Sequence, residues 1–242
     1  MTTLTKIIVS IVMALLLVSC NFDMNLGPGI SGNGNVTTET RDLDASFIGI
    51  KASEGLDVYL TQGNSESIKV QADENLHEII LTEIRNGVLH IHTSENIRRS
   101  SAQKVMVQFD DIENITSTSG SDVYSTNTIK ADRLELKSTS GSDMELDIDV
   151  NSIICNSTSG SDMRLSGTTD RFTAESNSGS DIKAGNLKAR ICNASASSGS
   201  DITLYSSEEL TARASSGGDI TYYGNPSKVN KKDGVSGSIR KH

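Results

Sequence analysis

The sequence contains no tryptophan and only two prolines, Pro28 and Pro226, and aromatic residues make up 4% of it. Few aromatic side chains, together with abundant Ser, Thr, Asn, Asp and Gly, favour many short strands joined by turns over packed helices. The sequence also lacks an excess of positive charge, because its formal net charge is −9 and its Lys and Arg residues are scattered. Proteins that bind nucleic acids need a basic patch. We therefore predict an all-β protein with no nucleic-acid partner.

Apolar residues are concentrated in one run, from Ile7 to Val18, which follows a lysine. The run is shorter than the ~20 apolar residues that span a bilayer, and it is typical of an export signal. Leu17-Val18-Ser19-Cys20 resembles the lipobox of bacterial lipoproteins, which implies cleavage before the cysteine and a lipid on it. We predict a signal peptide over 1–19, lipidation of Cys20 and a flexible glycine-rich tether over 20–35. An ordinary signal peptide or a membrane-spanning anchor is the alternative.

A four-residue motif, Ser-Gly-Ser-Asp, recurs along the second half of the chain. It is complete five times, and a sixth copy has a glycine in place of the second serine. The motif glycines are Gly120, Gly141, Gly160, Gly179, Gly199 and Gly217. Their spacing is nearly constant along the chain, and regular repetition at a period of about 20 residues indicates a solenoid.

Aligning the copies on their glycines gives columns of similar residues. Apolar side chains stand seven and five residues before the glycine and three and five residues after it, as at Leu136 and Met144. Odd offsets describe one face of a strand, and no helical period is present. We predict a single-stranded right-handed parallel β-helix, or β-solenoid, with about 20 residues per coil. The small residues three residues before each glycine, which are serine or alanine, and the serines one residue before it are expected to point inward. The glycine allows a sharp bend, and capping coils should be atypical.

Two cysteines test this alignment. Cys155 and Cys192 fall two coils apart, so they should be roughly 9–10 Å apart along the axis. That distance is too large for a disulfide. We expect both to be buried free thiols that act as small apolar residues.

The sequence before the repeats is rich in strand-like segments but lacks the motif. One coil is recognisable around Gly55, with Ile48, Ile50 and Ala52 at inward offsets and Asp57 at the aspartate position. We therefore predict one continuous domain over 36–240. Its parts are an N-terminal part (36–110), the motif repeats (111–224) and a C-terminal cap (225–242).

Several segments together carry a resemblance to a known family. They are Phe47 to Ile50, Leu56 to Leu60, Val70 to Leu76, Gly87 to Ile91, the Ser-Gly-Ser-Asp array and Val235 to Ile239. Over about residues 36 to 240, the chain resembles the putative auto-transporter adhesin, head GIN domain family, formerly a domain of unknown function and common in lipoproteins of Bacteroidetes. The resemblance implies a β-helix-like fold and an adhesive role, and it supplies no catalytic residues.

The sharpest chemical feature is a column of aspartates at the motif position. Its members are Asp57, Asp122, Asp143, Asp162, Asp181, Asp201 and Asp219. Like charges about 5 Å apart repel by roughly 1 kcal/mol per pair in water-like surroundings, so something must offset the repulsion. Each aspartate could cap its own turn by accepting backbone N–H groups, the column could bind a sugar or a protein, or it could bind calcium. No other cofactor is expected.

We therefore predict a lipid-anchored module of the cell envelope, at the outer membrane, that presents a β-helix face to a glycan or a surface protein. The alternatives are a polysaccharide-processing enzyme of the lyase or hydrolase type and a purely structural envelope protein. No nucleophile motif surrounds a serine, and Glu54, Glu113, Glu135 and Glu145 form no recognisable catalytic pair. We predict no catalytic residues and no metal ligands outside the aspartate column.

Overall fold

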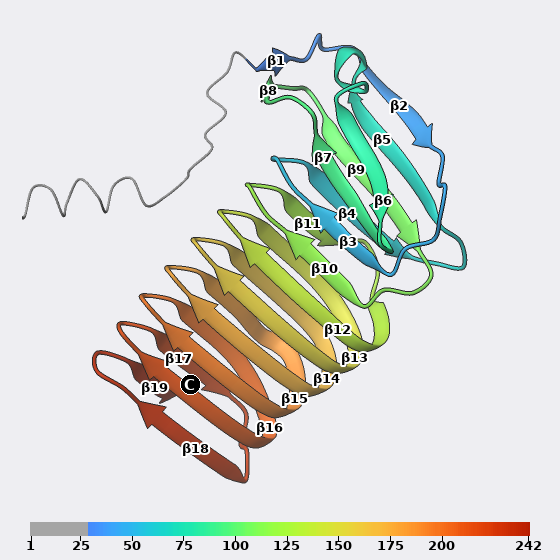
Figure 1. Cartoon of the computed structure of the whole chain (residues 1–242). Coiled ribbons are helices and arrows are strands. Elements are labelled where there is room, and N and C mark those ends of the chain that lie inside the picture. The colour runs from blue at the N-terminus through green and yellow to red at the C-terminus, as the bar shows by residue number, and fades with distance from the viewer. Residues whose placement is uncertain (1–28) are drawn as a thin grey trace, which may run out of the picture.

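The chain folds almost entirely into strands (Figure 1). This structure, a computed structural model, describes residues 29–242. The strands wind into a parallel β-solenoid of about 7 turns with roughly 19 residues per turn, which confirms the predicted fold class. The predicted signal peptide (1–19) and Cys20 lie outside the described residues. In residues 29–242, no helix has the length and apolar character needed to cross a membrane.

The Ser-Gly-Ser-Asp repeats form the regular part of the solenoid, stacked along its long axis (Figure 1). Its strands are β10 (Asn114–Ser117), β11 (Asp122–Ser125), β12 (Ile129–Thr139), β13 (Asp143–Thr158), β14 (Asp162–Asn177), β15 (Asp181–Ser197), β16 (Asp201–Ser215) and β17 (Asp219–Tyr223). Strands β13 to β16 each start at a motif aspartate, bend at a corner and end just before the next motif. We call the side that follows each turn the aspartate face and the side that precedes each turn the opposite face.

The predicted apolar columns fill the interior. Consecutive strands pair in parallel, so that Leu136, Cys155 and Ala174 lie in one column and Met144 and Met163 in another. All of these side chains are buried. Every coil buries the side chains that stand at the same distances along the chain from its glycine. Burial of these apolar columns therefore holds each coil to its neighbours.

The cysteine prediction is confirmed. Cys155 and Cys192 are both buried and free. Burial raises the pKa of both thiols, that of Cys192 to about 11. They therefore pack as small apolar groups and are poor nucleophiles near neutral pH.

The tight turn differs in one respect from the prediction. Ser159, which precedes Gly160, is exposed instead of inward, and the corresponding serines of the other repeats are exposed as well. Ser159 and Gly160 have φ values of 59° and 71°, so both lie in the left-handed region that a two-residue turn requires. Ser159 is therefore part of the turn, and the alternation of inward side chains resumes at Ser161, which is buried. The predicted bend at the glycine is confirmed.

Buried serines close each turn and connect the coils. Ser157 Oγ lies 2.9 Å from Ser161 Oγ and donates to the Ser161 carbonyl at 2.9 Å. Ser161 Oγ accepts the N–H of Thr158 at 3.2 Å and lies 2.8 Å from the carbonyl of Ser138 in the preceding coil. These bonds satisfy polar groups that would otherwise be costly to bury. The expectation that inward serines bond along the axis is therefore confirmed.

The N-terminal part belongs to the same sheet as the repeats. Its coil strands are β3 (Gly49–Ala52), β4 (Asp57–Gln62), β7 (Val88–Thr93) and β9 (Gln103–Phe109), and its antiparallel strands are β2 (Val36–Arg41), β5 (Ser67–Asp73) and β6 (Ile80–Arg85), with one 3₁₀ turn, η1 (Glu74–Leu76). Strands β3 and β4 pair on one side with β10 and β11 and on the other with β7 and β9. Antiparallel pairing of β5 with β9 and of β6 with β7 then ends the parallel stack. Strands of both parts thus belong to one hydrogen-bonded sheet.

Two expectations for this end of the molecule are wrong in detail. Ile48 is 48% exposed and Phe47 is buried instead, because β3 begins only at Gly49 and the alternation does not extend back to Ile48. The expected tether over 20–35 is not flexible from residue 29 onward. There, β1 (Ile30–Ser31) pairs with β8 (Ile97–Arg99), and the carboxylate of Asp73 accepts the N–H of Gly34. The rest of the expected tether lies outside the described residues.

The C-terminal cap is one further, atypical coil, as predicted. Its strands β18 (Lys228–Asp233) and β19 (Ser238–Lys241) pair with β16 and β17. Lys231 lies opposite Ala212 and Asp233 opposite Ala214, so charged residues take positions that are apolar in the coils before it. Lys231 Nζ lies 4.7 Å from the ring centroid of Tyr222 and covers the end of the core.

Candidate binding face

The structure aligns the seven predicted aspartates in one column. Asp57 lies opposite Asp122, and each following aspartate lies opposite the next, as far as Asp219. The column continues beyond both ends, to Lys104 next to Asp57 and to Ser238 next to Asp219. Each of these aspartates starts a strand directly after a tight turn, which is why all seven project from the same edge of the aspartate face.

Basic side chains neutralise part of this column. Lys183 Nζ lies 2.8 Å from Asp162 and 3.2 Å from Asp181, and Arg240 lies 3.2 Å from Asp219. The hydrogen bond to Asp162, followed by the one to Asp181, raises the pKa of Lys183 against the opposing effect of burial. Cations within the face therefore offset the repulsion at the middle and at the C-terminal end of the column.

Three other aspartates of the column, Asp57, Asp122 and Asp201, have an unfavourable environment for their charge. Burial first, and then the neighbouring carboxylates, raise the pKa of Asp122 and of Asp201. Burial also raises the pKa of Asp57, against the attraction of Lys104. In these carboxyl groups the charged form is less favourable than in water.

Turn capping does not explain the column. In residues 29–242, none of the seven carboxylates accepts an N–H from the backbone of its own turn. In the five complete motifs the buried serine accepts this N–H instead, as Ser161 does for Thr158. The aspartate N–H groups bond instead to the preceding coil, for example Asp162 N–H to Ser142 O at 3.2 Å. In the same part of the chain, no three His, Cys, Asp or Glu side chains converge to hold a metal ion.

Removing the charge of Asp122 and Asp201 is expected to stabilise the fold at neutral pH. Because the folded-state pKa values of these two carboxyl groups are raised, their protonation stabilises the fold, and this stabilisation is fully present below the unfolded-state pKa. It is lost as the pH rises through the folded-state pKa. The variant Asp122→Asn with Asp201→Asn should therefore melt at a higher temperature than the parent at pH 7, and the difference should vanish toward pH 3. Thermal melts followed by circular dichroism across pH 3–8 measure this. Asp162→Asn, which removes a partner of Lys183 and lies beside neither Asp122 nor Asp201, serves as the control and should not raise the melting temperature.

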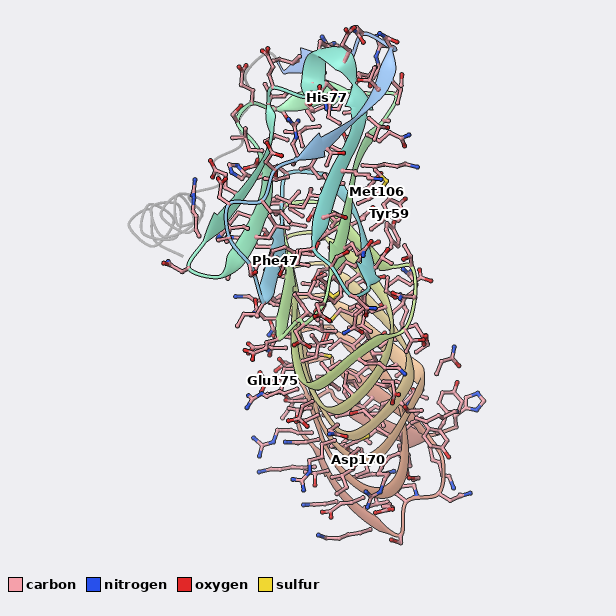
Figure 2. All side chains as sticks on the ribbon, turned by 90° about the vertical axis from the view of Figure 1, so that its right-hand side faces the viewer. Phe47, Tyr59, His77, Met106, Asp170 and Glu175 are labelled. Carbon is pink, nitrogen blue, oxygen red and sulfur yellow. The ribbon has the colours of Figure 1, made fainter. Side chains whose placement is uncertain are left out.

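A second row of side chains runs beside the aspartates on the same face. Tyr59 and Tyr124 stack with ring centroids 5.3 Å apart, and the Tyr124 hydroxyl donates to Asp122 at 3.4 Å. Burial and the carboxylate of Asp122 raise the pKa of Tyr124 to about 12. Figure 2 shows Tyr59 and Met106 together on one side of the molecule and Glu175 on the other, with Asp170 at the corner between them. The aspartate face is thus a long surface, separate from the opposite face.

Sequence reasoning did not identify a hollow at the C-terminal end of this face. Its main side chains are Tyr205, Tyr223 and Lys188. It lies where the motif spacing changes, because the step from Gly179 to Gly199 is longer than the step from Gly199 to Gly217. That irregularity is the signal in the sequence that could have located it.

Comparison with known proteins agrees with the geometry. A family model described as "Putative auto-transporter adhesin, head GIN domain" matches residues 46–226. A putative adhesin from Bacteroides fragilis has a similar structure, with 22% identity, a TM-score of 0.81 and coverage of 88% of this chain and 100% of that chain. A putative adhesin from Parabacteroides merdae has 18% identity, a TM-score of 0.74 and coverage of 88% and 98%.

A structure described as a putative lipid binding protein from Parabacteroides distasonis is similar too. It has 21% identity, a TM-score of 0.70 and coverage of 88% of this chain and 99% of that chain. No curated protein matches the sequence. At these identities, the solved structures show a shared fold.

Proposed function

Because the chain belongs to the putative auto-transporter adhesin, head GIN domain family, we propose that it is a lipid-anchored adhesion module whose aspartate face binds a glycan or a protein on a cell surface. Membership of this family indicates an adhesion-type role and a place at the cell envelope. The proposal adds the binding surface, the class of partner and the mode of attachment.

The observation that carries the proposal is the unbroken register of seven aspartates along one rigid edge. Carboxylates accept hydrogen bonds from sugar hydroxyls and from basic side chains. Parallel strands repeat every 4.7–4.9 Å or so, and such a surface needs little ordering when a partner binds. A partner that donates hydrogen bonds would also relieve the repulsion that raises the pKa of Asp122 and Asp201.

A matched pair of triple variants tests the aspartate face. In Asp143→Asn, Asp162→Asn and Asp181→Asn, three charges are lost from the column. In Glu113→Gln, Glu135→Gln and Glu175→Gln, the same number of negative charges is lost from the segments that precede the turns. We expect the first variant to lose at least roughly tenfold in affinity and the second to bind like the parent.

The measurement is a glycan-array screen, combined with adhesion to intact cells, of the chain from Asn21 onward, which keeps every described residue. The parent and both triple variants are each measured with calcium and with EDTA. If both triple variants bind equally, or if the parent binds no glycan and no cell surface, the aspartate face is not a binding surface. If calcium leaves both the binding and the melting temperature unchanged, the partner acts on the carboxylates directly.

The proposed anchor is a lipid on Cys20, at the outer membrane. Metabolic labelling of the full chain with an alkyne fatty acid, followed by membrane fractionation, tests it. We expect labelled protein in the outer-membrane fraction and no label in Cys20→Ser. Equal labelling of the variant would exclude Cys20 as the lipid attachment site.

A further inference from the structure

The aspartate face is interrupted by a bulge near its C-terminal end. Ala184 pairs with Leu204 and Lys188 pairs with Tyr205, so the intervening residues Gly185 to Leu187 have no partners in β16. A hollow of about 640 Å³ lies beside the bulge. Its polar and aromatic lining consists of Lys183, Asn186, Lys188, Thr203, Tyr205 and Tyr223. This volume is within the range of sites that hold small ligands.

Two tyrosine rings form part of this hollow. Tyr205 and Tyr223 lie opposite each other on consecutive strands, and both are partly exposed. A Cβ atom at position 185 would lie 3.4 Å from Cε2 of Tyr223. The ring of Tyr223 therefore reaches across β16 to the bulge in β15, and the glycine leaves room for it. A tyrosine offers an apolar ring with a polar hydroxyl, which matches a sugar, whose C–H faces alternate with hydroxyl groups.

The charge in the hollow distinguishes it from the rest of the aspartate face. Lys188 Nζ lies 4.0 Å from the ring centroid of Tyr205. Across the described part of the chain, Lys188 forms no ion pair, whereas Lys183 is shared by Asp162 and Asp181. In a chain with a net charge of −9, an ammonium group that no carboxylate neutralises favours an anionic ligand.

We propose that this hollow binds an acidic sugar residue of a surface glycan. The sugar ring packs against Tyr223, and its acid group pairs with Lys188. Asn186 and Thr203 supply side-chain hydrogen bonds to the sugar hydroxyls. The inference rests on the proposed adhesion function and adds the class of sugar and the subsite that recognises it.

Isothermal titration calorimetry of the chain from Asn21 onward, in EDTA, tests the proposal. The probes are an oligogalacturonate trimer, a sulfated galactose trimer and a neutral galactose trimer. We expect at least one acidic probe to bind roughly tenfold more tightly than the neutral one. The two acidic probes distinguish a carboxylate from a sulfate as the recognised group.

Variants within the hollow locate the site. Lys188→Gln and Tyr223→Ala should each weaken binding of the acidic probe by roughly fivefold or more. Lys137→Gln, an exposed lysine on the opposite face, is the matched control and should bind like the parent. Thermal melts show whether each variant is folded, and Lys188→Gln changes an exposed side chain only.

Three results would overturn the inference. They are the absence of binding to both acidic probes, equal binding of the neutral probe, and undiminished binding by Lys188→Gln. If the parent still adheres to cells through Asp143, Asp162 and Asp181 in any of these cases, the proposed function stands and only the acidic-sugar subsite is lost. If the acidic probes bind through Lys188 while the triple aspartate variant adheres normally, the hollow is the binding site and the aspartate column is not.

Discussion

Replacing Gly167 with alanine is expected to lower the free energy of unfolding by about 3 kcal/mol or more. Gly167 lies within β14 at a φ of 110°, and a Cβ atom there would come within 1.9 Å of the carbonyl oxygen of Ile148 in the neighbouring strand. No side-chain rotation relieves such a contact, because both atoms belong to the backbone frame. The two strands must separate locally and lose ladder hydrogen bonds. Urea denaturation followed by circular dichroism measures the change.

The control for this prediction is Gly179→Ala in the next turn. Gly179 also has a positive φ, of 70°, but a Cβ atom there would meet nothing within 4 Å. This substitution should cost only the left-handed backbone penalty of about 1–2 kcal/mol. Equal destabilisation by the two substitutions would show that the close approach to Ile148 has no energetic weight.

The second large effect is expected from removing the charges that close the C-terminal end. The variant Lys231→Val with Asp233→Val makes the inward positions of β18 apolar, like the Ala212 and Ala214 positions beside them. The outer edge of β18 has no partner among the described strands, and an apolar, unpaired edge is a template for another chain. We expect this variant to form end-to-end assemblies larger than the parent, measured by size-exclusion chromatography with light scattering at several concentrations.

Asn230→Val with Lys232→Val is the matched control. It adds the same number of valines to β18, but at positions that alternate with the inward ones, since Lys232 lies opposite the exposed Arg213. This variant should have the same mass in solution as the parent. If both variants assemble to the same extent, the added hydrophobicity of β18 causes the assembly. The charges of Lys231 and Asp233 would then not be what prevents further coils from stacking on this end.

The repeats could be predicted from the sequence because each coil meets the same surroundings. A column such as Leu136, Cys155 and Ala174 is apolar at every level, so the buried face follows from the alignment. The period-two rule failed at Ser159, where two left-handed residues form the turn and leave Ser159 exposed before the same alternation resumes at Ser161. In the N-terminal part there is no repeat to align, and the antiparallel partners of β5 and β6 depend on tertiary packing.

The candidate site was predictable to the same extent. The aspartate column follows from the motif, since all seven aspartates share one offset from a turn. Its neutralisation by Lys183 and Arg240 was not predictable, because those residues belong to no repeated pattern. The tyrosine hollow depends on a bulge in β15, and a bulge breaks the alignment on which the other predictions depend.

The position of β3 and β4 in the stack bears on how the chain can fold during synthesis. Asp143 meets its partner Asp162 in the very next repeat, so each repeat can dock on the previous one soon after it leaves the ribosome. Gly49 has to find Val88 on one side and Asn114 on the other, and both of these partners lie much further along the chain than one repeat. Closing these longer loops costs more entropy. The first coil therefore waits through a longer stretch of synthesis for each neighbour than a repeat does, and until then its two strand edges are open to other nascent chains.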